Sequence, residues 1–302
     1  MHIGIVGAGG IGGFYGGLLS RAGHTVRILA RGEHLAAIND RGLEIKMNDG
    51  SFVVHPEASD DPATLVGCEH VLVSVKSYSL PEVGPALVAA ANAGSSIVPL
   101  LNGIDVAERL VKLGVPKASI IGGFVRASLE RIAPGVIERK SSFDLIVLGE
   151  LDHVHRDRTT SLVAAIAAAG ATARESDNIL YELWRKFAFI VPMGVGCGLA
   201  RRPMGPVMAT ERGRDLIKGA VHEIVAVSQG VLTAEDEPKT FAEFSAIAAP
   251  LKPSFLLDLE RGRNTELDLL AGTVSRLGKE LGVPTPIHDV ATAAFEIATT
   301  SS

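Results

Sequence analysis

Short apolar runs alternate with helix-like stretches along the first half of the chain. Buried strands are predicted at residues 2–6, 25–30, 70–75, 96–101 and 119–124. Helical spacing of apolar residues predicts helices at residues 11–22 and 33–41. Residues 43–55 alternate around Asn48-Asp49-Gly50, which is typical of a β-hairpin. This order of strands and helices with short connections predicts a parallel, doubly wound α/β sheet.

The pattern changes in the second half of the chain. Strands are predicted within residues 135–149, followed by an Ala-rich helix at 159–169 and a short strand at 171–175. After Ser176-Asp177 the strand signals almost vanish, and Asp177 is suited to cap a helix that begins near Asn178. Further helices are predicted at residues 210–229, 234–249, 254–261, 267–281 and 289–298. We therefore predict a Rossmann-type α/β domain over residues 1–176 and an all-α domain over residues 177–302.

Composition excludes several classes of protein. The chain has 302 residues, of which 47% are hydrophobic but only 5% aromatic, a mix that favours close packing of helices on a buried sheet. The net charge is -5 and no basic block occurs, so we expect no nucleic-acid partner. Cys68 and Cys197 lie far apart, which indicates a reduced, cytoplasmic protein. The N-terminus has no leader pattern, and the longest apolar run, residues 187–200, is shorter than the ~20 residues of a membrane span.

A glycine motif follows the first predicted strand. The residues Gly7-Ala8-Gly9-Gly10-Ile11-Gly12 match G-x-G-x-x-G and open a predicted helix. The first glycine permits a tight turn, the second lets the backbone approach a pyrophosphate, and the third allows close contact between helix and strand. The N–H groups of the helix N-terminus then face the phosphates. The motif predicts a dinucleotide site, and the alternative is a glycine turn without a ligand.

The residue after the second strand distinguishes the two nicotinamide cofactors. A site for NAD usually has Asp or Glu here to bind the ribose 2′-hydroxyl, whereas this chain has Arg31. A guanidinium binds a 2′-phosphate through paired, charge-assisted hydrogen bonds, so Arg31 favours NADP(H). The nearby Glu33 keeps NAD open, and a solvated surface arginine is the other alternative.

Two further polar residues end predicted strands. Lys76 follows the strand at 70–75, and Asn102, within Asn102-Gly103, follows the strand at 96–101. Ligands of open α/β sheets bind beyond the carboxyl ends of the strands, so both residues are candidates to contact cofactor or substrate. The alternatives are a solvated lysine and a simple Asn-Gly turn.

With these motifs, the chain resembles the ketopantoate reductases (2-dehydropantoate 2-reductases) from end to end. Besides the glycine motif, the resemblance rests on Leu29-Ala30-Arg31-Gly32-Glu33-His34-Leu35, Val75-Lys76, Leu101-Asn102-Gly103, Trp184-Arg185-Lys186, Ser254-Phe255-Leu256-Leu257-Asp258, Gly262-Arg263-Asn264-Thr265-Glu266-Leu267-Asp268 and Gly282-Val283-Pro284-Thr285-Pro286. The region from 254 to 286 is the most specific outside the Rossmann half.

The resemblance implies NADPH-dependent reduction of a 2-keto acid, first of all 2-dehydropantoate to pantoate in pantothenate biosynthesis. It implies the following roles: Lys186 is the general acid, Glu266 hydrogen-bonds the substrate hydroxyl, Ser254 holds the substrate, Asn102 and Lys76 line the nicotinamide side, and Arg31 binds the 2′-phosphate.

The chemistry of hydride transfer supports a catalytic lysine. Hydride addition to a ketone creates an alkoxide, which a positioned ammonium group both stabilises and protonates. Lys186 begins an apolar stretch, so partial desolvation is expected to lower its pKa. Without the resemblance, a lysine that snorkels from a helix face is the alternative.

The chain also departs from the family pattern. Asparagines expected four and eight residues after the catalytic lysine are Ile190 and Gly194, and one expected three residues before the substrate serine is Leu251. Loss of these amides weakens discrimination for a hydroxylated substrate, so a more apolar 2-keto acid is the alternative substrate. Pro192 and the nearby glycines are expected to bend or loosen this helix. The pair Arg201-Arg202 either binds a carboxylate or is solvated.

Other interpretations remain at this stage. One is a non-catalytic NADP-binding sensor, and another is a 6-phosphogluconate or 3-hydroxy-acid dehydrogenase, whose lysine has different flanking residues. His153 and His155 form a His-x-His pair, but a surface location is favoured over a metal site and no metal is predicted. We expect a small-molecule partner and no membrane partner, and a homodimer is left open.

Overall fold

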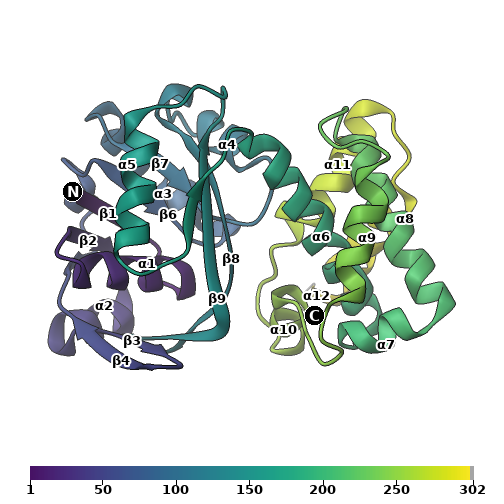
Figure 1. The fold of residues 1–302 in the computed structure, drawn as a ribbon, viewed down its shortest axis with the longest axis horizontal. Coiled ribbons are helices and arrows are strands. Elements are labelled where there is room, and N and C mark those ends of the chain that lie inside the picture. Colours follow the sequence, from purple (N-terminus) through teal and green to yellow (C-terminus); the bar gives the residue numbers. More distant parts are fainter. Residues whose placement is uncertain (300–302) are drawn as a thin grey trace. The chain divides into compact units, whose positions relative to one another are not determined.

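The computed structural model describes residues 1–299, which divide into two compact units (Figure 1). The α/β unit consists of Met1–Leu101 and Val106–Ile179. The helical unit consists of the segment Asn102–Asp105 and the chain from Leu180 onward. The chain passes between the units close to residue 176, where the strand signals end. The grouping of residues 102–105 with the helical unit was not predicted.

A five-stranded parallel sheet forms the centre of the α/β unit, in the order β5-β2-β1-β6-β7. Its strands are β1 (His2–Val6), β2 (Thr25–Leu29), β5 (Glu57–Ser59), β6 (His70–Val73) and β7 (Ser96–Pro99). Every residue of β6 and β7 is buried, which explains their continuous apolar sequence. The prediction of a parallel sheet is confirmed, and β1 lies between β2 and β6. The short edge strand β5 was not predicted.

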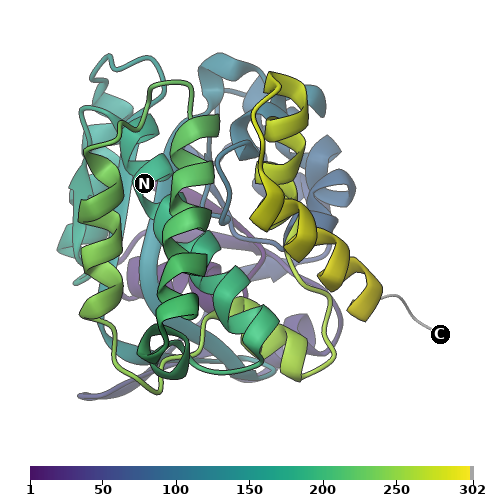
Figure 2. The ribbon, with the colours of Figure 1, turned by 90° about the vertical axis from the view of Figure 1, so that its right-hand side faces the viewer.

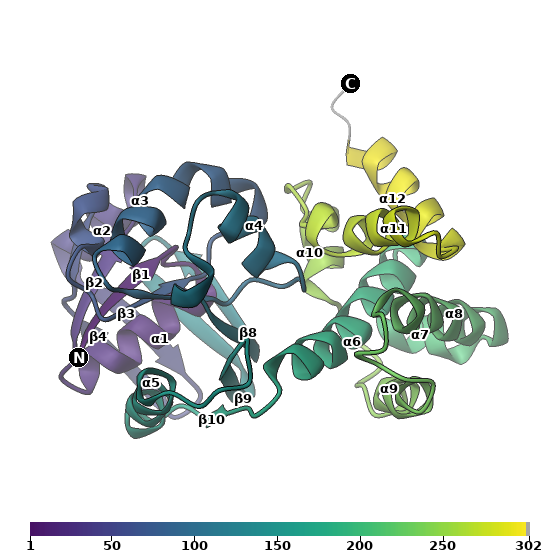
Figure 3. The ribbon, with the colours of Figure 1, turned by 90° about the horizontal axis from the view of Figure 1, so that it is seen from above.

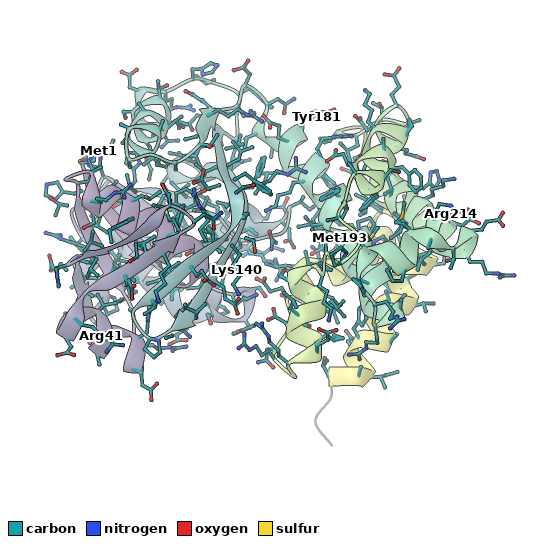
Figure 4. All side chains as sticks on the ribbon, turned by 60° about the horizontal axis from the view of Figure 1, so that its bottom comes forward. Met1, Arg41, Lys140, Tyr181, Met193 and Arg214 are labelled. Atoms are coloured by element: carbon teal, nitrogen blue, oxygen red, sulfur yellow. The ribbon has the colours of Figure 1, made fainter. Side chains whose placement is uncertain are left out.

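A second, mixed sheet completes the α/β unit. It consists of β3 (Leu43–Met47), β4 (Gly50–Val54), β8 (Ile121–Ala133), β9 (Val136–Glu150) and β10 (Ala173–Glu175). The hairpin β3–β4 is confirmed. The strand predicted at 119–124 is only the start of β8, because the apolar pattern ends where β8 enters a long antiparallel pair with β9. Lys140 of β9 forms an ion pair with Glu130 of β8 across this hairpin (Figure 4).

The glycine-rich helix α1 (Gly10–Arg21) packs against both sheets. A Cβ atom at Gly16 would lie 3.1 Å from Ile5 of β1, and one at Gly17 would lie 2.5 Å from Ile45 of β3. Each glycine costs about 1 kcal/mol of helix propensity relative to alanine. Close packing on two sheets offsets this cost and fixes the position of the helix N-terminus.

Four further helices cover the sheets of the α/β unit: α2 (Gly32–Arg41), α3 (Leu80–Asn92), α4 (Val106–Lys112) and α5 (Asp157–Ala168). Helices α2 and α5 lie close to their predicted positions. Helix α3 was not predicted, and its sequence contains Pro81 near its start and Pro85 inside it. The short helix α4 was also not predicted.

The helical unit contains no strand within the residues that the structure describes (Figures 2 and 3). Its helices are α6 (Ile179–Ala200), α7 (Met204–Ala209), α8 (Glu211–Val227), α9 (Asp236–Ser245), α10 (Ser254–Glu260), α11 (Ala271–Leu281) and α12 (Pro286–Thr299). Helix α8 contacts α9, α11 and α12. The helix predicted at 267–281 is divided, because a 3₁₀ turn η4 (Leu267–Leu269) precedes α11. Helix α7 was not predicted.

Helix α6 runs without a break through Pro192, so the expected loosening does not interrupt it. By length and composition α6 is able to cross a membrane, but 56% of its most apolar window is buried inside the protein. Phe187, Val191 and Val195 of this helix are buried in the core of the helical unit. Such burial is typical of the core helix of a helical domain.

Candidate active site

The glycine loop packs closely on the strand next to it. Gly7 has φ +90°, and a Cβ there would lie 2.7 Å from the backbone nitrogen of Val75. The hydroxyl of Ser74 donates a hydrogen bond to the carbonyl of Gly7 over 2.7 Å. A Cβ at Gly12 would overlap the same hydroxyl and the Gly7 carbonyl. Both glycines therefore have the roles that the motif predicts for tight turning and close packing.

The face of the loop at Gly9 is open, by contrast. A Cβ at Gly9 would meet no atom within 4 Å, and the helix begins at the next residue, Gly10. Ala8 is buried and Ile11 is half-buried, so the loop presents backbone on this face. The first turn of α1 contains no acidic residue. A bare backbone at a helix N-terminus without a nearby carboxylate fits the pyrophosphate of a dinucleotide.

His34 of α2 holds the loop from behind. Its Nδ1 accepts a hydrogen bond from the N–H of Gly135 over 2.9 Å, so Nε2 carries the proton and donates it to the carbonyl of Ala8 over 2.7 Å. Burial lowers the pKa of His34, which keeps the ring neutral. The sequence singled out His34 only as part of a family motif, and this bond to the loop was not predicted.

Arg31 lies directly after β2, at the start of α2, as the sequence order requires. Its side chain is exposed and forms an ion pair with Glu82 in the first turn of α3. Lys76 follows β6 and is half-buried at the start of a 3₁₀ turn, Ser77–Ser79. The glycine loop, Arg31 and Lys76 thus follow three neighbouring strands of the parallel sheet, at the edge where such sheets bind nucleotides.

Lys186 and Asn102 are joined within the helical unit. Lys186 lies in the second turn of α6, and its Nζ donates a hydrogen bond to Oδ1 of Asn102 over 2.7 Å. Both side chains are partly buried. The hydrogen bond to Asn102 sets the direction of the Lys186 ammonium group.

The segment Asn102–Asp105 is anchored at two more points. Gly103 has φ +124°, and a Cβ there would lie 3.2 Å from the side chain of Leu269. Asp105 is buried and accepts a hydrogen bond from Arg276 of α11 over 2.7 Å. These contacts fix the backbone directly after Asn102, the partner of Lys186.

Glu266 and Ser254 occupy two different environments. Glu266 is 8% exposed, and its carbonyl accepts a hydrogen bond from the N–H of Leu269, the residue that contacts Gly103. Ser254 is exposed at the first position of α10. Glu266 is therefore connected, through Leu269, to the segment Asn102–Asp105. Ser254 precedes Phe255, which packs against Gly194 of α6.

Two family models match the chain. One, described as ketopantoate reductase PanE/ApbA, matches residues 3–153, and its C-terminal counterpart matches residues 178–297. The chain belongs to the ketopantoate reductase family. It is therefore an NAD(P)H-dependent oxidoreductase that acts on a CH–OH or C=O group. The family assignment does not support the sensor or 6-phosphogluconate dehydrogenase interpretations.

Known proteins are similar to this chain over nearly its whole length. An uncharacterized oxidoreductase YkpB of Bacillus subtilis is 30% identical over 97% of each chain. The crystal structure of a PanE/ApbA family ketopantoate reductase from Ralstonia eutropha is 28% identical, with a TM-score of 0.88 over 99% of this chain and 98% of that one. A ternary structure of D-mandelate dehydrogenase with NADH and anilino(oxo)acetate, at 22% identity and a TM-score of 0.87 over 99% and 98%, shares the fold.

The positions that depart from the family pattern are apolar or have apolar neighbours. Gly194 is buried, and a Cβ there would lie 3.6 Å from Cβ of Phe255. Phe255 in turn forms an edge-to-face pair with Phe295, with ring centroids 4.8 Å apart. Ile190 is half-buried on α6, and Leu251 is 39% exposed. Ile190 and Gly194 of α6 thus stand where the resemblance led us to expect amides, and Gly194 packs against Phe255 of α10.

The neighbours of Lys186 hold α6 in place. Arg185 donates hydrogen bonds to Thr240 over 2.8 Å and to Glu243 over 2.6 Å. One turn earlier, Tyr181 (Figure 4) donates its hydroxyl to Asp236 over 2.8 Å. These bonds fasten one face of α6 to α9, which defines the direction of the adjacent Lys186. No sequence signal beyond the family motif indicated this role.

The His-x-His pair lies in a surface network. His155 contacts Glu175 over 2.9 Å and Asp177 over 3.2 Å, and these acidic partners raise its pKa. Across residues 1–299, no group of three or more His, Cys, Asp or Glu side chains is arranged to hold a metal ion.

Proposed function

We propose that this protein reduces 2-dehydropantoate to pantoate with NADPH, and that Lys186 is the general acid. One observation carries the proposal: the Lys186 ammonium is hydrogen-bonded to Asn102, and the segment that follows Asn102 is fastened to the helical unit at Gly103 and Asp105. A surface lysine that merely snorkels from a helix has no need of such a partner.

The chemistry follows from the charge that develops on the substrate. When bound, NADPH supplies a hydride to the keto carbon, and the C=O π electrons move onto oxygen. The Lys186 ammonium stabilises this oxygen and donates a proton to it, which yields the hydroxyl and a neutral amine that solvent reprotonates. The amide oxygen of Asn102 accepts a hydrogen bond from this ammonium group and thereby orients it. General acid catalysis of this kind contributes roughly 10²–10⁴-fold in rate.

Two residues are proposed to bind the substrate. Glu266, a buried residue, accepts a hydrogen bond from a substrate hydroxyl, so a hydroxylated acid binds better than one without the group. Ser254 offers its hydroxyl from the exposed start of α10. Both residues belong to the helical unit, as Lys186 does.

The cofactor is proposed to be NADPH. The backbone between Gly7 and Gly12 fits the pyrophosphate, Arg31 binds the 2′-phosphate, and Lys76 and Asn102 line the nicotinamide side. The open face at Gly9 and the acid-free first turn of α1 support this assignment.

A second candidate substrate is a more apolar 2-keto acid. The observation that favours it is the replacement of the expected amides by Ile190 and by Gly194, which packs against the buried Phe255. The D-mandelate dehydrogenase of the same fold was solved with NADH and anilino(oxo)acetate, so an aromatic 2-keto acid and NADH belong in any assay.

Specificity constants test these proposals. Purified protein is assayed with NADPH and NADH against 2-dehydropantoate, an aliphatic 2-keto acid and an aromatic 2-keto acid. The highest kcat/KM for 2-dehydropantoate with NADPH supports the first candidate. A higher value for an apolar 2-keto acid, reversed toward 2-dehydropantoate by Ile190→Asn, supports the second. Absence of turnover with every pair contradicts both.

A further inference from the structure

An ion pair joins the segments that follow the two strands next to β1, the strand that leads into the glycine loop. Arg31 follows β2, and Glu82 lies in the first turn of α3, which follows β6. Strands β2 and β6 are the two neighbours of β1 in the parallel sheet, and β1 leads into the glycine loop. The guanidinium Nη1 of Arg31 donates a hydrogen bond to Oε1 of Glu82. The residue expected to bind the 2′-phosphate thus already has an anionic partner.

The pair is fully within reach of solvent. The side chains of Arg31 and Glu82 are 72% and 58% exposed. Exposed ion pairs contribute little net stability because water solvates both charges well. A dianionic phosphate that makes two charge-assisted hydrogen bonds to the guanidinium is therefore able to displace a single carboxylate.

We propose that Glu82 competes with the 2′-phosphate of NADPH for Arg31 and thereby narrows the preference of the enzyme for NADPH over NADH. This inference rests on the proposed role of Arg31 in NADPH binding. Binding of the phosphate breaks the ion pair and leaves the Glu82 carboxylate close to a group of the same charge. The ribose of NADH carries a neutral 2′-hydroxyl, so NADH encounters neither cost.

This pairing of charges differs from an NAD site and also from a site in which an arginine alone faces the 2′-phosphate. In an NAD site a carboxylate follows the second strand and repels a 2′-phosphate directly. Here the guanidinium follows the second strand, and the carboxylate comes from the neighbouring helix α3. The two charges cancel, so removal of Glu82 releases a positive site without any change in Arg31 itself.

Direct binding measurements test the proposal. Calorimetric titrations give the Kd of NADPH, NADH and adenosine 2′,5′-bisphosphate for the wild-type protein and for Glu82→Gln. A pair of unit charges 4 Å apart in water corresponds to about a fivefold change in binding. We expect Glu82→Gln to tighten NADPH and adenosine 2′,5′-bisphosphate by about three- to tenfold and to leave NADH unchanged. Glu57→Gln is the matched control, because it removes a carboxylate paired with Arg27 of β2, the strand that precedes Arg31.

The outcomes separate this inference from the proposed function. Suppose that NADPH binds the wild-type protein and that Arg31→Ala weakens this binding. If Glu82→Gln then leaves the ratio of the NADH and NADPH Kd values unchanged, or lowers the affinity for NADPH, the competition is wrong while the NADPH site stands. The competition is also wrong if Glu82→Gln tightens NADPH binding by the full three- to tenfold even when Arg31 is replaced, as measured by Arg31→Ala/Glu82→Gln against Arg31→Ala. If neither dinucleotide binds the wild-type protein, the proposed function itself fails.

Discussion

Lys186 and Asn102 are 84 residues apart in the chain, yet Nζ of the lysine lies 2.7 Å from Oδ1 of the asparagine. Asn102 belongs to a short segment that leaves β7 and groups with the helical unit, where α6 carries Lys186. The bond sets the direction of the ammonium group before any substrate arrives. A catalytic acid oriented in advance loses less entropy in the transition state than a freely rotating one.

Replacement of Lys186 by Ala is expected to lower kcat by roughly 10²–10⁴-fold, because the alkoxide loses its proton donor. The affinity for NADPH, measured by titration, is expected to stay within about twofold. Lys218→Ala in α8 is the matched control, since it removes an equal charge from the same unit. Equal turnover in Lys186→Ala and wild-type protein would show that another group protonates the substrate.

Asn102→Ala is expected to reduce kcat by about 10- to 100-fold, since the lysine loses the acceptor that orients it. Asn102→Asp retains an oxygen in that place and adds a negative charge, which favours the ammonium form. The alkaline limb of the pH–kcat profile is therefore expected to move to higher pH in Asn102→Asp. A purely structural role for Asn102 predicts lower stability in both variants and no movement of this limb.

Two glycines of the loop are expected to respond in opposite ways to alanine. Gly9 has φ -73° and open space around its Cβ position, so Gly9→Ala folds with unchanged stability but loses about 10-fold or more in dinucleotide affinity. At Gly12 a Cβ overlaps Ser74 and the Gly7 carbonyl, so Gly12→Ala loses about 1–3 kcal/mol of stability. Thermal unfolding and NADPH titration separate the two effects. Unchanged NADPH affinity in a folded Gly9→Ala protein would contradict the cofactor site.

Stability is expected to fall as the pH drops from 6.5 toward 4, because of buried His70. Burial lowers its pKa to about 4, and its Nδ1 has no hydrogen-bond partner within residues 1–299. The folded state therefore favours the neutral ring, and the stabilisation is complete above pH 6.5 and lost as pH falls through the folded pKa. The lost contribution is roughly 3 kcal/mol, at 1.36 kcal/mol per pKa unit.

His34 adds to this trend with the same sign, since burial also lowers its pKa. Urea unfolding of wild-type and His70→Asn protein between pH 4 and 7.5 measures the effect, and His2→Asn, at an exposed position, is the control. If the free energy of unfolding changes equally with pH in wild-type and His70→Asn protein, the role assigned to His70 is wrong.

The order of elements that builds the cofactor half was readable from the sequence. Short apolar runs located β1, β2, β6 and β7, because buried strands leave a largely apolar signal. The segments predicted at 43–55, 119–124, 135–149 and 171–175 marked parts of the strands of the second sheet, but their pairing was not readable, because the outer parts of β8 and β9 are amphipathic and are held by pairing between distant residues. Local propensity carries little information about such long-range pairing.

Motif position proposed Arg31, Asn102 and Lys186 as site residues one by one, and these roles stay predictions. Their contacts could not be predicted. The partners Glu82 and His34 were not assigned, because a contact between residues far apart in the chain leaves no periodicity or spacing in the sequence. The assignment of Asn102 to the helical unit likewise depends on packing of Gly103 that no local pattern encodes.

The central claim is most directly tested by following the hydride itself. Wild-type protein is mixed with 2-dehydropantoate and NADPH that carries deuterium at both C4 positions, and the product is analysed by mass spectrometry. The account predicts pantoate with one deuterium at C2, formed in equal amount to NADP⁺, and at least about 100-fold slower formation in Lys186→Ala. Oxidation of NADPH without deuterium in a hydroxy acid, or no reaction with any 2-keto acid, would contradict it.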